Sequence, residues 1–144
     1  MAATTGHDFI TLGADVGGED ADNATQQHVL GLRRLLRQKC SKIASEGLKE
    51  IALVLRIDGS VQAWKKSGAE NIFFWKKRAY ATADIFVPIE VWSNGDASGI
   101  RRFLLEEVMS AIRLVVERVN RKGVALEMKA FERALANVKR QYLG

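Results

Sequence analysis

The sequence has few of the side chains that metal sites and covalent chemistry require. Its 144 residues include one cysteine, one proline and two histidines. The lone Cys40 cannot form an internal disulfide, and no second cysteine or helically spaced histidine joins His7 or His28 to make a zinc site. Because Cys40 falls on an apolar helical stripe, we interpret it as a core residue and not as a nucleophile. We therefore expect no metal and no cofactor.

Motifs for phosphate binding and for acid–base catalysis are also missing. The glycines at 13 and 17 neither follow a predicted strand nor open a helix, so they do not form a nucleotide-binding loop. Glu106 and Glu107 are adjacent on a predicted helix, where they point about 100° apart and cannot face each other as a catalytic pair. The sequence thus predicts a binding protein and not an enzyme. A small enzyme or ligand carrier with a pocket between sheet and helices has the least support.

No hydrophobic run approaches the length of about 20 residues that a membrane span needs. The first 18 residues lack a basic segment followed by an apolar one, and they contain acidic residues that targeting peptides avoid. We therefore expect a cytoplasmic protein that does not use a membrane as its partner.

The charges are unevenly distributed along the chain. Residues 1–24 contain five acidic side chains and no Lys or Arg, whereas the remaining 120 residues contain 22 basic and 12 acidic ones, a net charge of +10. Small, polar residues with only Phe9, Ile10, Leu12 and Val16 as apolar anchors predict a flexible acidic N-terminal tail over 1–22. Residues 23–144 are long enough and apolar enough for a single α+β domain.

Apolar periodicity divides this domain into elements. A helix beginning near Asn23 carries an apolar stripe to Ile43, and its basic residues form either a solvated face or, less commonly, a nucleic-acid footprint. Alternation over 51–57, followed by Asp58-Gly59, predicts a hairpin with 61–64. Strands are further expected over 71–75 and 78–92, the latter lying at an edge or ending near Pro88. Helices follow over 100–122 and 128–142. The predicted fold is an N-terminal helix, an antiparallel sheet of three to four strands, and two C-terminal helices packed on one face of the sheet.

Aromatic and charged residues gather on the opposite face of the predicted strands. Such residues suit a protein interface, and aromatic rings beside basic groups also suit single-stranded nucleic acid. Asp84 is a partner contact or a catalytic acid, or, more commonly for such a residue, it forms a structural hydrogen bond or ion pair with Arg78 or Arg56. Alternatively, a third layer of the fold or a dimer mate covers the aromatic rings. The candidate partner-binding residues are Arg56, Trp64, Trp75, Lys76, Lys77, Arg78, Tyr80, Asp84 and Trp92.

The segments 51–60 and 78–92 and the helix 100–122 together resemble the small α+β immunity proteins of bacterial polymorphic toxin systems. This resemblance, over about residues 50–122, implies a cytoplasmic antidote that binds a cognate toxin domain directly, without cofactor or turnover. Antidotes to nucleases are often acidic, so the basic body favours an acidic toxin domain as the partner. The alternative function is a nucleic-acid-binding module that uses the first helix or Lys76–Arg78. The apolar stripe of the last predicted helix packs either on the preceding helix or on a second copy of the chain, so the sequence also allows a homodimer.

Overall fold

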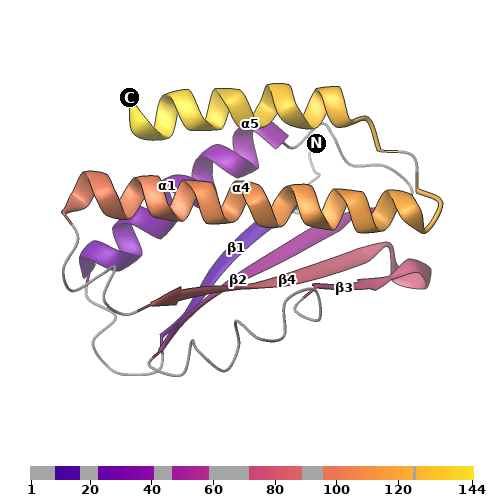
Figure 1. Ribbon diagram of the computed structural model, residues 1–144, viewed down its shortest axis with the longest axis horizontal. Coiled ribbons are helices and arrows are strands. Elements are labelled where there is room, and N and C mark those ends of the chain that lie inside the picture. The colour runs from indigo at the N-terminus through magenta and orange to yellow at the C-terminus, as the bar shows by residue number, and fades with distance from the viewer. Residues whose placement is uncertain (1–8, 17–22, 41–46, 59–71, 89–95, 125) are drawn as a thin grey trace, which may run out of the picture.

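The computed structural model describes residues 9–16, 23–40, 47–58, 72–88, 96–124 and 126–144. In chain order, the elements are β1 (Ile10–Val16), α1 (Asn23–Cys40), β2 (Glu50–Asp58), β3 (Ile72–Trp75), the 3-10 turn η2 (Lys76–Arg78), β4 (Tyr80–Pro88), α4 (Ala97–Arg121) and α5 (Met128–Leu143). The architecture of these residues is α+β, with three helices and one four-stranded sheet (Figure 1).

The sheet is mixed and mostly parallel, with the strand order β1-β2-β4-β3. β2 pairs in parallel with β1 on one side and with β4 on the other, and only β3 and β4 are antiparallel. The prediction of an antiparallel sheet is therefore wrong. It depended on a hairpin after Asp58, but β2 pairs with other strands on both sides, and the expected second strand at 61–64 lies outside the described residues.

A strand, and not a helix, is the first element of the fold. Residues 10–16, which were expected in a flexible tail, form β1 along the edge of β2. Ile10 and Leu12 alternate along β1 and are 1% and 2% exposed, so they belong to the core. These two buried side chains, set among glycines and acidic residues, are too short a pattern to identify a strand from the sequence. Their burial depends on contacts with the neighbouring β2 and α1.

The helices all lie on one side of the sheet, in two layers (Figure 1). α1 and α4 pack on the strands, whereas α5 packs mainly on α1 and α4. The two C-terminal helices thus lie on the predicted side, but α5 forms an outer layer. At its start, α5 also reaches the beginning of β1, where the Phe131 and Phe9 ring centroids are 5.9 Å apart. None of the described helices has both the length and the apolar run that a membrane crossing needs.

Several local predictions are confirmed. Ile51, Leu53 and Leu55 of β2 are buried beneath the helices, and Cys40 is a fully buried core residue. In addition, the structure shows that Asp96 caps α4, because its carboxylate accepts a hydrogen bond from the Gly99 amide at 2.7 Å. β4 ends at Pro88, which has no amide hydrogen to continue a ladder.

Candidate functional site

A fixed turn connects β3 to β4 at one end of the sheet. Trp75 pairs with Tyr80 across the antiparallel ladder, and η2 spans the residues between them. Ala79 closes this turn in the left-handed region (φ 52°), which costs an L-residue about 1 kcal/mol. Its carbonyl accepts hydrogen bonds from the amides of Lys49 at 2.7 Å and Glu50 at 3.4 Å. These bonds attach the turn to the start of β2 and hold its side chains in a defined arrangement.

Three aromatic rings form a row on the face of the sheet away from the helices. Phe73 and Trp75 are two residues apart on one strand, so their side chains share this face, and they are 51% and 46% exposed. Their ring centroids are 6.0 Å apart with an interplanar angle of 24°. Tyr80 continues the row from β4, with its centroid 5.6 Å from that of Trp75. The rings therefore support one another while two of them stay open to solvent.

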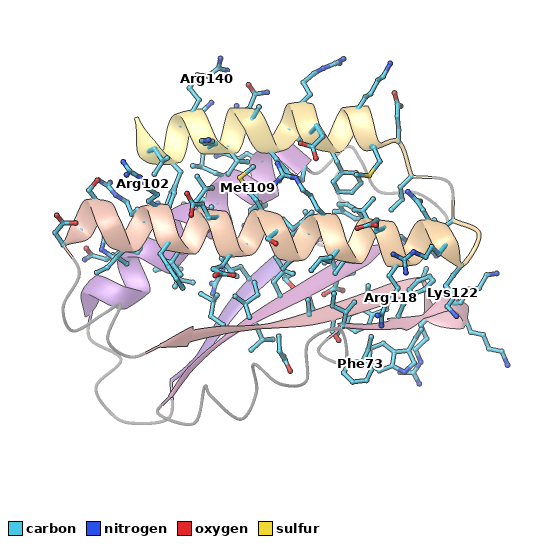
Figure 2. All side chains as sticks on the ribbon, in the orientation of Figure 1. Phe73, Arg102, Met109, Arg118, Lys122 and Arg140 are labelled. Atoms are coloured by element: carbon cyan, nitrogen blue, oxygen red, sulfur yellow. The ribbon has the colours of Figure 1, made fainter. Side chains whose placement is uncertain are left out.

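Basic side chains flank this row of rings. Lys76, Lys77 and Arg78 of η2 are all exposed. Lys122 follows the C-terminus of α4 at the same end of the molecule as Phe73 (Figure 2). The Lys76 amino group lies near the turn after α4, since a Cβ built on Gly123 would be 3.6 Å from Nζ. The aromatic–basic surface is defined here as Phe73, Trp75, Lys76, Lys77, Arg78, Tyr80 and Lys122.

The structure brings together five of the nine predicted partner-binding residues: Trp75, Lys76, Lys77, Arg78 and Tyr80. Asp84 shares their face of the sheet but lies four residues beyond Tyr80, about 13 Å along the strand. Arg56 is part of β2, opposite Phe86 of β4, but its side chain is outside the described set. Trp64 and Trp92 also lie outside the described residues. A role of these residues in partner binding remains a prediction.

Two members of the surface were not among the predicted residues. Phe73 carries a sequence signal, because its spacing of two from Trp75 on a strand places both on one face. Lys122 carries none, since it lies 44 positions after Arg78 and joins the surface only through the packing of α4 on the sheet. Arg118 is nearby but has a structural role, because its guanidinium donates a hydrogen bond to the Ile72 carbonyl at 2.9 Å.

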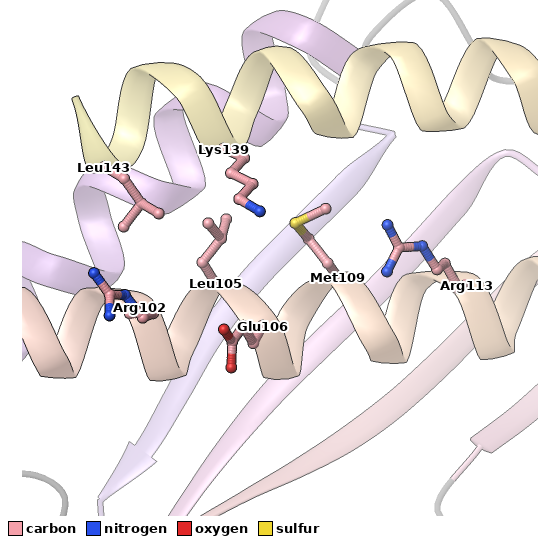
Figure 3. A pocket seen from close by; sticks show the side chains of 7 residues that line it. All are labelled: Arg102, Leu105, Glu106, Met109, Arg113, Lys139 and Leu143. Carbon is pink, nitrogen blue, oxygen red and sulfur yellow. The ribbon is translucent and has the colours of Figure 1, made fainter.

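A separate feature, a groove, lies between α4 and α5 (Figure 3). This groove has a volume of about 410 Å³ and is lined by Arg102, Leu105, Glu106, Met109, Arg113, Lys139 and Leu143. Arg113 donates hydrogen bonds to both carboxylate oxygens of Glu132, at 2.9 and 3.1 Å. This contact raises the pKa of Arg113 and lowers that of Glu132. The pair is exposed, so it joins the two helices without forming a reactive centre.

The described side chains provide little for catalysis. Burial raises the pKa of the Cys40 thiol to about 11, so the thiol is protonated at neutral pH and is a poor nucleophile. Within the described ranges, no group of three or more His, Cys, Asp or Glu side chains is placed to hold a metal ion. The aromatic–basic surface instead presents exposed rings and cations on a turn that backbone hydrogen bonds hold in place.

Comparison with known proteins gives one family match. The family model for immunity protein 44 (Imm44) matches residues 9–141, which includes β1 at one end and nearly all of α5 at the other. The match is therefore wider than the segment over which the sequence resembles immunity proteins. No curated protein and no solved structure matches the chain.

Proposed function

The chain belongs to the immunity protein 44 family, and from this membership we propose that it neutralises a cognate bacterial toxin by binding the toxin domain directly. In this proposal the protein acts stoichiometrically, as an antidote within a polymorphic toxin system, and turns over no substrate. Its place of action is the cytoplasm of the producing cell. The observation that carries the proposal is the family match over 9–141.

The aromatic–basic surface is the part of the molecule that we propose for toxin contact. Trp, Tyr and Arg contribute much of the binding energy in protein interfaces, because large rigid rings bury area at low entropic cost. Trp75, Tyr80 and Arg78 supply these three residue types within one short hairpin. The hydrogen bonds to the Ala79 carbonyl hold the turn, so little conformational freedom is lost when a partner docks.

The proposal predicts a toxin gene beside the gene for this protein, and it is tested with the toxin domain encoded there. The domain is expressed in a bacterial host with and without the full-length protein, and growth is measured. In parallel, the two purified proteins are mixed and analysed by size-exclusion chromatography with light scattering. We expect growth to be restored and a complex with fixed stoichiometry to form.

The two measurements separate the parts of this proposal. Restored growth without a complex would contradict direct binding, and a complex without restored growth would contradict neutralisation. Light scattering of the protein alone also tests the homodimer, which would appear at twice the 16.0 kDa mass of the chain.

A further inference from the structure

Building on the proposed function, we infer that the aromatic–basic surface docks on an acidic patch of the toxin domain that also exposes an apolar side chain. In this arrangement, carboxylates of the toxin meet the cations of η2, and the apolar side chain packs on Phe73 and Trp75. The partner is thus an acidic protein surface and not a nucleic acid.

The charge of the surface supports an acidic partner. Lys76, Lys77, Arg78 and Lys122 are exposed, and among the described residues no carboxylate lies within ion-pair distance of any of them. Neighbouring Arg121, in contrast, contacts Glu117 at 3.4 Å. Four cations at one end of a basic body produce a positive local field, which accelerates association with an acidic surface and slows it with a basic one.

The rings require the partner to be apolar at its centre. Phe73 and Trp75 are about half exposed although they stack on each other. Part of their apolar ring surface therefore stays in contact with solvent beside the cations. Aromatic side chains each bury about 150–250 Å² when fully covered. A partner that offered carboxylates alone would leave this area in water, whereas an apolar side chain ringed by acids would fill it.

The remaining charges on the same face distinguish a protein partner from nucleic acid. Glu50 pairs with Tyr80 in the register, and Asp84 pairs with Val54, so both acids belong to the open face of the sheet. A nucleic-acid strand that stacked on the rings and continued over the sheet would carry phosphates past these acids, which is unfavourable. Among the described side chains near the rings, the cations lie at the turn and at the end of α4. A compact acidic protein patch fits this distribution better than an extended polyanion.

The experiment measures binding of the purified toxin domain to the full-length protein by surface plasmon resonance at low and high salt. The first variant carries Lys76→Glu, Lys77→Glu and Arg78→Glu. Its control carries Lys129→Glu, Arg133→Glu and Lys139→Glu, which changes the net charge equally at exposed positions of α5. A second pair compares Trp75→Ala with Leu114→Ala, which removes a side chain that is also about half exposed. Circular dichroism verifies that each variant is folded.

We expect the η2 variant to bind at least about 100-fold more weakly, mainly through slower association, and to lose most of the salt dependence. The α5 control should change the dissociation constant by no more than about threefold, because its charges lie away from the interface. Trp75→Ala should weaken binding by about 30-fold, and Leu114→Ala should not.

Two results would overturn the inference while the proposed function stands. In the first, the η2 and α5 variants bind the toxin equally well. In the second, the wild type binds an oligothymidine of about 12 nucleotides and the η2 variant loses only that binding. If the wild type binds no toxin and restores no growth, the proposed function itself fails.

Discussion

Tyr142 of α5 is a buried tyrosine, only 7% exposed. Its hydroxyl donates a hydrogen bond to the His28 carbonyl at 2.9 Å and thereby joins α5 to α1. Burial raises its pKa from 10 to about 12, and the nearby Arg101 opposes this shift. The unfolded chain thus loses this proton at lower pH than the folded protein does. The contribution of Tyr142 to stability is complete below pH 10 and is lost as the pH rises towards about 12.

Substitution of Tyr142 by Phe tests this assignment. At neutral pH we expect the free energy of unfolding to fall by about 1 kcal/mol, because the hydrogen bond is lost while the ring remains. Between pH 10 and 12, stability should fall less steeply in Tyr142→Phe than in the wild type. Urea unfolding over this pH range measures both effects. Cys40, whose pKa is also raised, acts equally in both proteins and cancels. Parallel pH profiles would contradict the assignment.

At the scale of elements, arginines from the covering helices hold both edge strands of the sheet. Arg33 of α1 donates a hydrogen bond from Nε to the Leu12 carbonyl of β1 at 2.6 Å. Arg118 of α4 likewise donates a guanidinium hydrogen bond to the Ile72 carbonyl of β3. Unpaired carbonyls of edge strands are sites for unwanted pairing with other chains, and a charged side chain on one of them hinders that pairing. The basic face of α1 thus includes at least one cation with a structural role.

Replacement of Arg33 by Ala is therefore expected to weaken the attachment of β1. A hydrogen bond with a charged donor contributes about 1.5–3 kcal/mol, so the free energy of unfolding should fall by about that amount. Hydrogen exchange should quicken first in the amides of β1. Arg34→Ala is the matched control, because Arg34 is exposed on the same helix and the charge change is identical. Equal stability of the two variants would show that the Arg33 contact contributes nothing.

At the scale of the whole molecule, the core extends from β1 to α5. Leu12 is 2% exposed, and Phe131 of α5 reaches the Phe9 ring at the beginning of β1. The first strand is thus part of the same packed unit as the last helix.

We expect Leu12→Ala to lower the free energy of unfolding by about 2–5 kcal/mol, as for other buried leucines whose loss leaves a cavity. Leu30→Ala, at a position that is 39% exposed on α1, should change it by less than about 1 kcal/mol. Chemical denaturation of both variants gives the comparison. If Leu12→Ala has the same free energy of unfolding as the wild type, Leu12 belongs to a flexible tail and not to the core.

The sequence by itself determined which face is buried in five of the elements. Periods of 3.6 and two located the stripes of α1, α4 and α5 and the buried faces of β2 and β4, because an apolar side chain leaves water whatever its element packs against. The same reasoning placed Trp75 and Tyr80 among the candidate residues, and Pro88 marked the end of β4.

Only the tertiary structure decided how the strands pair and what completes the candidate surface. A period of two is common to parallel and antiparallel strands, so it does not encode the direction or the identity of a partner strand. The Asp58-Gly59 signal is local, whereas the pairing of β2 with β1 and β4 depends on contacts between segments far apart in the chain. Lys122 joined the hairpin cations for the same reason. Its position follows from helix packing, which no local pattern in the sequence records.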